Sequence, residues 1–223
     1  MTTRHHALAA CIAAVLLSAC NLAGARSNPV ALPDPKLDIP LAATPGKAVA
    51  VFAGGCFWGV EAVFEHVRGV TDATSGYSGG GALSAHYQLV GTGRTGHAES
   101  VRVTYDPSKV TYGQLLEVFF SVAHDPTQVD RQSPDVGPQY RSELFTTGKA
   151  QRDVATAYIA QLDAAKVFGK RIVTKVEPLD GFYPAEAYHQ DYLRLHPDEP
   201  YIVYHDAPKL VALKRMFPAL YRG

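Results

Sequence analysis

The sequence predicts an α+β domain, a two-layer sandwich in which helices pack on a mainly antiparallel sheet with a split βαβ (ferredoxin-like) core. From residue 47 on, the patterns follow the order strand, helix, strand, strand, helix, strand, helix, strand. Residues 98–105 alternate apolar and polar side chains, as a half-buried strand does. Residues 48–53 are continuously apolar, as a strand buried on both faces is.

Each further element is predicted from its local pattern. Apolar residues recur at helical spacing after residue 56, and again within 112–123 and 148–168. The glycine pair at 54–55, the glycine run at 79–81 and Asp106-Pro107 mark turns. The remaining strands are predicted at 70–77, 142–145 and 172–176, and the remaining helices at 184–195 and 209–217.

Length and charge limit the classes of protein. A chain of 223 residues is long enough for one domain with a substantial core. Its 21 basic residues balance 21 acidic ones, which argues against nucleic acid as the main partner. The histidines show no recognised metal-ligand spacing, since His189 and His196 lie apart without a third ligand. We expect a monomer with no bound metal and no nucleic-acid partner.

The first residues have the layout of a secretory signal peptide. Residues 7–17 are apolar but too short to span a bilayer. Leu17-Ser18-Ala19-Cys20 resembles the bacterial lipobox, in which the cysteine becomes the lipidated first residue of the mature chain. The alternative is a plain signal peptide with a chance cysteine. The resemblance implies a signal peptide at 1–19 and several acyl chains on Cys20, as durable anchoring requires.

This interpretation predicts an extracytoplasmic protein, lipid-anchored to a bacterial membrane. Asn21 follows the lipidated cysteine, where inner-membrane retention uses aspartate. In a Gram-negative host this favours the periplasmic side of the outer membrane. Residues 20–46 carry repeated prolines, which favour extended, weakly structured chain, so we predict a tether at 20–46 and a folded domain at 47–223.

Cys56 is the candidate nucleophile. Cys11 leaves with the signal peptide and Cys20 is predicted to be acylated, so Cys56 is the remaining free thiol. It lies at a predicted strand-to-helix turn, where free peptide N–H groups and the helix dipole stabilise a thiolate. The alternative is a small hydrophobic residue buried in the core.

Glu99 is the candidate acid. It is in phase with Val101, Val103 and Tyr105, so it faces the buried side of its strand. A buried carboxyl has a raised pKa and can donate a proton. The alternative is that the strand begins after Glu99 and leaves it in solvent.

Other side chains give weaker signals on their own. Phe57 and the single tryptophan, Trp58, can form an apolar pocket for a methyl group, although core packing is the commoner role. Tyr87 and Tyr140 place phenols in or near loops, where surface tyrosines are common. Asp135 lies in a polar stretch between prolines, where it can simply form a turn.

Six short motifs, in order and spacing, resemble the peptide-methionine sulfoxide reductase A family over about residues 49–204. They are Gly54-Gly55-Cys56-Phe57-Trp58-Gly59-Val60-Glu61, Gly76-Tyr77-Ser78-Gly79-Gly80, Gly96-His97-Ala98-Glu99, His124-Asp125-Pro126, Gly137-Pro138-Gln139-Tyr140-Arg141-Ser142 and Tyr188-His189-Gln190-Asp191-Tyr192. The resemblance implies an enzyme of protein repair that reduces methionine S-sulfoxide, free or in oxidised proteins, without a bound cofactor.

The resemblance also implies roles for the candidate residues. Cys56 would attack the sulfoxide sulfur and become a sulfenic acid. Glu99 would protonate the sulfoxide oxygen, and Tyr87 and Tyr140 would hydrogen-bond it. Asp135 would form part of the polar side of the site, and Phe57 and Trp58 would form a pocket for the methyl group. His189 would orient neighbouring groups.

The sequence departs from the family in one respect. Many members carry a resolving cysteine near the C-terminus, and residues 201–223 contain none. We therefore expect an external thiol reductant, thioredoxin-like or glutaredoxin-like, to resolve the sulfenic acid.

Two other functions compete with this interpretation. One is a thiol protease, against which the inward Glu99 and the missing Cys-His-Asn order argue. The other is a lipoprotein that binds oxidised peptides with Cys56 idle, which predicts binding that survives Cys56→Ser without turnover.

Overall fold

The computed structural model describes residues 29–223. The predicted signal peptide, Cys20 and the first part of the predicted tether lie outside these residues. In the described part, no helix has both the length and the apolar character that crossing a membrane requires.

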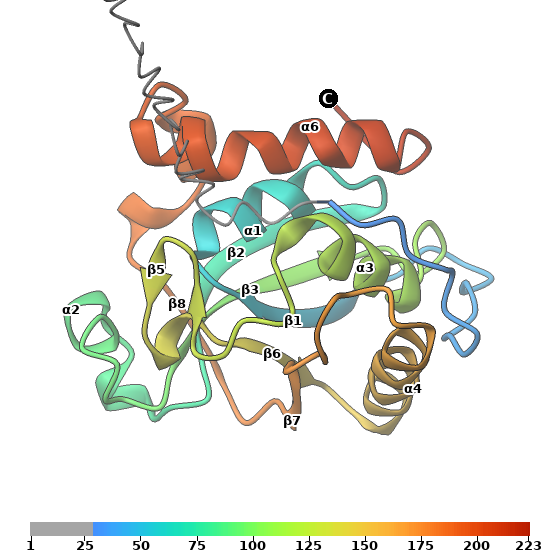
Figure 1. Ribbon diagram of the computed structural model, residues 1–223, viewed down its shortest axis with the longest axis horizontal. Helices are drawn as coiled ribbons and strands as arrows, with labels where there is room; N and C mark the ends of the chain where they lie inside the picture. Colours follow the sequence, from blue (N-terminus) through green and yellow to red (C-terminus); the bar gives the residue numbers. More distant parts are fainter. Residues whose placement is uncertain (1–28) are drawn as a thin grey trace, which may run out of the picture.

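A six-stranded sheet forms the centre of the fold (Figure 1), in the order β7, β6, β1, β3, β2, β8. The strands are β1 Ala48–Gly54, β2 Val70–Ser78, β3 Ala98–Tyr105, β6 Ser142–Thr146, β7 Lys175–Pro178 and β8 Phe182–Pro184. All neighbouring strands in this sheet are antiparallel except β6 and β7. Because β3 lies between β1 and β2, the β1–α1–β2 unit is a split βαβ. The predicted α+β class is confirmed.

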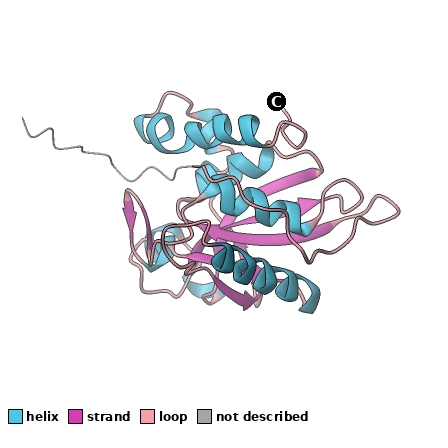
Figure 2. Ribbon diagram, turned by 45° about the vertical axis from the view of Figure 1, so that its right-hand side comes forward, coloured by secondary structure: helices cyan, strands magenta, loops and turns pink. Residues whose placement is uncertain are grey.

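Helices cover one face of this sheet. The helices are α1 Phe57–Glu65, α2 Tyr87–Val90, α3 Tyr112–Val118, α4 Lys149–Ala165, α5 Tyr192–Leu195 and α6 Ala207–Met216. Phe52 of β1 stacks on Phe64 of α1 with ring centroids 4.6 Å apart. Phe120, in the π-helical turn η2 (Phe119–Ala123) that continues α3, meets Tyr158 of α4 in the same core. Helix α6 lies over α1, at the top of Figures 1 and 2.

The opposite face of the sheet carries a smaller apolar cluster. Val51 and Ala53 alternate with Phe52 along β1 and pack there with Ala98 and Phe145. Both faces of β1 are therefore buried, as its continuous apolar run predicts. This burial fixes the end of β1, and hence the start of α1, in the interior.

The predicted elements after residue 170 are wrong in part. The strand predicted at 172–176 begins at Lys175. The Ile172 N–H donates to the Asp163 carboxylate and not to a backbone carbonyl of a neighbouring strand. The helix predicted at 184–195 is replaced by β8 and two separate short helical turns, η4 (Ala187–His189) and α5. Pairing of β8 with β2 outweighs the local helical pattern here.

The N-terminal segment from Pro29 to Gly46 lies on the domain. Its Val30 N–H donates to the Ser121 carbonyl at 3.1 Å, and the Tyr158 hydroxyl donates to the Pro33 carbonyl at 3.0 Å. Leu32 and Ile39 pack against the main core. It forms no helix or strand, as its prolines predict, and these residues of the predicted tether pack on the domain rather than standing apart from it.

His124 is a buried neutral histidine where η2 ends. Its Nδ1–H donates to the Phe119 carbonyl at 3.1 Å, and its Nε2 accepts from the Ser142 hydroxyl at 2.7 Å. A carbonyl oxygen can only accept, so Nδ1 carries a hydrogen, and in the neutral ring Nε2 is then the acceptor. Burial lowers the His124 pKa to about 3.

We therefore predict that His124 makes the protein sensitive to mild acid. Below the unfolded histidine pKa of about 6.5, the unfolded chain binds a proton that the native protein does not. The free energy of unfolding therefore decreases as the pH is lowered. Between pH 7 and pH 5, wild type should lose about 2 kcal/mol more unfolding free energy than His124→Gln. Urea unfolding of both proteins at the two pH values measures this. Equal losses would contradict a neutral buried His124.

Candidate active site

Cys56 lies at the turn between β1 and α1, as predicted. Gly55 has a φ of 90°, a conformation that a side chain would strain, and an added Cβ would collide with Gln132. Cys56 is the N-cap residue of α1 and is partly exposed. The tight turn thus presents the thiol at the edge of the core.

All seven residues predicted for the catalytic and substrate-binding roles line one cavity of about 280 Å³ beside Cys56. They come from four parts of the chain and are Cys56, Phe57, Trp58, Tyr87, Glu99, Asp135 and Tyr140. The sheet and the loops around β5 (Asp135–Val136) bring them together.

Glu99 is buried near the start of β3, with 4% of its surface exposed. This excludes the alternative of a solvated strand end. Its Oε2 accepts the Phe57 N–H at 3.1 Å, which places the carboxyl at the first turn of α1. Burial raises the Glu99 pKa to about 8, with Asp135 and Asp206 contributing, while the Phe57 N–H opposes the shift. At neutral pH the carboxyl therefore carries a proton that it can donate.

The Cys56 thiol does not match the expected electrostatics. Burial, followed by the charges of Glu99, Asp206 and Asp135, raises its pKa well above the ordinary value, and only the Trp58 N–H acts in the opposite direction. This direction is opposite to the one that the helix N-terminus alone would give. In the free protein the Cys56 side chain therefore keeps its proton at neutral pH.

Tyr87 and Tyr140 contribute phenols to the same cavity. Tyr87 begins α2, where its backbone N–H donates to Glu186 at 3.0 Å. Tyr140 ends the short 3₁₀ turn η3 (Pro138–Tyr140). Burial raises the pKa of both hydroxyls, with Glu99 contributing, so both remain hydrogen-bond donors at neutral pH.

Aromatic contacts hold Trp58 in one orientation. Its indole N–H donates to His189 Nδ1 at 3.2 Å, and its ring stacks on Tyr192 with centroids 3.7 Å apart. The His189 ring also contacts Phe57 at 5.0 Å and Tyr87 at 4.4 Å between centroids. His189 thus orients the groups that line the cavity.

Two cavity residues were missed by the sequence argument. The Tyr201 hydroxyl donates to Asp135, so Asp135 is held by a partner 66 positions away along the chain. Glu199 also lines the cavity and accepts from the Tyr192 hydroxyl at 2.7 Å. Both lie between α5 and η5 (Ile202–Asp206), where no periodicity marks them, and the motif at 188–192 was the nearest signal.

The described residues offer no metal-binding cluster. Among residues 29–223, no three or more His, Cys, Asp or Glu side chains gather in a way that could hold a metal ion. The chemistry of the described cavity is that of a thiol, a protonated carboxyl and two phenols.

Comparisons with known proteins agree with this site. The family model for peptide methionine sulfoxide reductase matches residues 48–219. Peptide methionine sulfoxide reductase MsrA 2 of Mesorhizobium japonicum is 62% identical over 179 residues, which cover 80% of this chain and 92% of that protein. The MsrA 2 of Synechocystis is 53% identical, covering 83% of this chain and 88% of that protein.

Solved structures show the same fold. Mxr1 of Saccharomyces cerevisiae in reduced form has a TM-score of 0.63 and 33% identity, covering 73% of this chain and 92% of that one. Methionine sulfoxide reductase A of Corynebacterium diphtheriae has a TM-score of 0.59 and 36% identity, covering 76% and 88%.

Proposed function

The chain belongs to the peptide methionine sulfoxide reductase family and is an enzyme that reduces methionine sulfoxide to methionine; we propose that Cys56 is its nucleophile and Glu99 its acid. One observation carries this proposal: a cysteine and a buried carboxyl with a raised pKa line the same cavity. A thiol protease has less support, because His189 bonds Trp58 and His124 bonds Ser142, which leaves neither as a base for Cys56.

The reaction follows from these groups. A sulfoxide oxygen leaves poorly unless it is protonated, and protonated Glu99 supplies the proton. The Cys56 sulfur attacks the sulfoxide sulfur, and Tyr87 and Tyr140 hydrogen-bond the oxygen as its S–O bond breaks. The transient bond between the two sulfurs breaks as the protonated oxygen passes to Cys56, so methionine leaves with two more electrons and Cys56 becomes a sulfenic acid. The proton that the Cys56 thiol loses replaces the one that Glu99 donated.

Substrate orientation comes from the aromatic side of the cavity. Phe57 and Trp58 form an apolar surface for the terminal methyl group, and the His189 hydrogen bond and Tyr192 stacking keep the indole in place. The thiol, the oxygen donors and this methyl surface make three distinct contacts. Three contacts suffice to distinguish the two sulfoxide epimers, and we assign the S epimer to this site.

The cycle requires an external thiol. In the described part of the chain Cys56 is the free cysteine, and residues 201–223 offer no second one. A sulfenic acid returns to a thiol by condensing with another thiol and then by thiol exchange. We assign this reduction to a thioredoxin-like or glutaredoxin-like protein. The substrates that we assign to the enzyme are oxidised proteins and peptides that carry methionine sulfoxide.

We also propose that the enzyme is anchored outside the cytoplasm by lipid on Cys20. The apolar run before Leu17-Ser18-Ala19-Cys20 supports this location, and Asn21 favours the periplasmic side of the outer membrane in a Gram-negative host. In cells, wild type should sediment with membranes, and Cys20→Ser should move most of the enzyme to the soluble fraction. Acyl chains on the mature N-terminal peptide, found by mass spectrometry, would agree, whereas an unmodified Cys20 would refute the anchor.

A single turnover tests the central proposal. The reduced protein is mixed with a methionine S-sulfoxide peptide without added thiol, and methionine and the oxidation state of Cys56 are followed by mass spectrometry. We expect about one methionine per enzyme, because residues 29–223 contain no second cysteine that could resolve the sulfenic acid of Cys56. The R-sulfoxide peptide is the matched control and should give none. Absence of methionine from the S epimer would refute the proposal.

A further inference from the structure

Cys56 lines a second cavity of about 200 Å³, separate from the substrate cavity. Its other walls come from the end of β1, from η2, from the turn between β4 (Arg131–Gln132) and β5, and from η5 and α6. Gly54, His124 and Gln132 lie on the inner side. Cys56 and the hydrogen-bonded pair Asp135 and Tyr201 line both cavities, so these three residues separate them.

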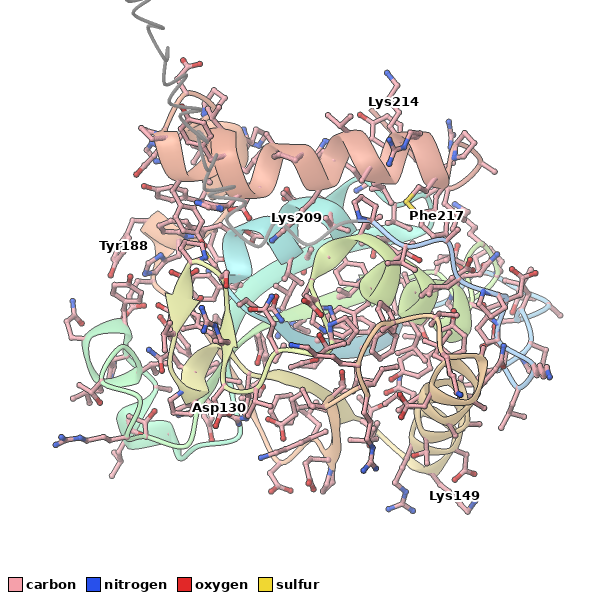
Figure 3. All side chains as sticks on the ribbon, viewed as in Figure 1. Asp130, Lys149, Tyr188, Lys209, Lys214 and Phe217 are labelled. Carbon is pink, nitrogen blue, oxygen red and sulfur yellow. The ribbon has the colours of Figure 1, made fainter. Side chains whose placement is uncertain are left out.

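The second cavity opens to solvent beside the first turn of α6. Tyr204 and Pro208 line it and are exposed. Lys209 lies beneath α6 in Figure 3, whereas Lys214 projects away from the molecule. The Lys209 side chain is 14% exposed and its ammonium pairs with buried Asp206 at 3.0 Å, so an ion pair contributes to one wall. A small polar group can enter here without passing Trp58.

The chemistry of a sulfenic acid makes this second opening useful. A thiol that displaces the oxygen from a sulfenic sulfur attacks from the side opposite the S–O bond. In the proposed reaction, Glu99, Tyr87 and Tyr140 hold that oxygen in the substrate cavity. Cys56 also lines the second cavity, which therefore offers the thiol a separate approach to Cys56.

We propose that the external thiol reaches the oxidised Cys56 through this second cavity, while the substrate cavity holds the departing oxygen; the inference rests on the proposed function. The entering sulfur forms an S–S bond with Cys56 as the S–O bond breaks. The proton of the thiol and the hydroxyl leave as water, so the step is balanced. A second thiol then releases Cys56 by exchange.

The occupant is a cysteinyl thiol, borne either by a small thiol or by the exposed cysteine of a reductant protein. Both sources present the same group, and the probes are L-cysteine and reduced thioredoxin. Cys56 is first converted to its sulfenic acid with one equivalent of S-sulfoxide peptide. Each probe is then added, and the sulfenic acid that remains after increasing times is trapped with dimedone and measured by mass spectrometry.

Two variants narrow the cavity from opposite walls, Pro208→Trp on α6 and Ser133→Phe on the β4–β5 turn. With the probe that reacts faster in wild type, each should slow consumption of the sulfenic acid at least about tenfold, because the attacking sulfur loses its line of approach. The matched control is Val211→Trp, an exposed position on the same helix that does not line the cavity. It should react as wild type does.

The first half-reaction separates this inference from the proposed function. A methionine burst in each variant shows a folded substrate cavity, and no burst in wild type would instead refute the reductase chemistry. A saturating N-acetylmethionine amide, which fills the substrate cavity, should leave thiol attack unchanged. If it blocks the attack, or if both narrowed variants react at the wild-type rate, entry through the second cavity is refuted.

Discussion

The Cys56→Ser variant is expected to form no detectable methionine, a loss of at least about 10³-fold. A serine hydroxyl is a much weaker nucleophile than a cysteine sulfur, and it needs a base to activate it. Burial keeps Glu99 protonated, and His189 Nδ1 already accepts the Trp58 N–H, so neither group is available as that base. The measurement is methionine release from an S-sulfoxide peptide with a large excess of dithiothreitol, followed by chromatography.

The same variant distinguishes catalysis from binding. Cys56 is partly exposed and makes no cap hydrogen bond with its side chain, so the free energy of unfolding should change by less than about 1 kcal/mol. Peptide binding, measured by calorimetry, should persist because Phe57 and Trp58 are unchanged. Methionine formation by Cys56→Ser at a substantial fraction of the wild-type rate would exclude Cys56 as nucleophile.

The main site residues could be placed from the sequence because local patterns position them. The glycine pair before Cys56 predicts a tight turn, and the two-residue period of β3 predicts that Glu99 faces inward. Both geometric predictions are confirmed. The roles assigned to these residues stay predictions until the variants are measured.

Contacts between distant segments could not be predicted. The Asp135–Tyr201 hydrogen bond and the stacking of Trp58 on Tyr192 join parts of the chain with no shared periodicity. The same limit explains the wrong helix at 184–195, since pairing of β8 with the edge of β2 is not visible in a local window. It also explains why the packing of residues 29–46 on the domain was not predicted.

The direction of the Cys56 pKa shift is a further result that depends on the fold. The sequence places Cys56 at a helix N-terminus, which by itself lowers a thiol pKa. The fold adds burial and brings Glu99, Asp206 and Asp135 close, and these raise it. The sign of the Cys56 pKa shift therefore depends first on burial and then on carboxyls from distant segments, and the sequence pattern near Cys56 shows neither.

Glu99→Gln is expected to lower the rate of methionine formation by about 10²- to 10⁴-fold. The amide has nearly the same shape, and its oxygen can still accept the Phe57 N–H, but it cannot donate a proton to the sulfoxide oxygen. Peptide affinity should change little, because the methyl surface is untouched. The single-turnover rate constant at neutral pH measures the effect, and Glu99→Asp is the matched control that retains a carboxylic acid.

The stability of Glu99→Gln should change in the opposite direction to its activity. The native Glu99 carboxyl keeps its proton up to a pKa of about 8, whereas the unfolded one loses it near 4.3, so wild-type stability falls as pH rises between these values. Glutamine has no such titration. At pH 7 the variant should therefore be more stable than wild type by up to about 3 kcal/mol, and at pH 4 the difference should vanish. Urea unfolding at both pH values tests this. A variant that is less active because it is damaged would be less stable at both, whereas a loss of rate with a gain of stability at pH 7 identifies Glu99 as a proton donor that the fold holds at an energetic cost.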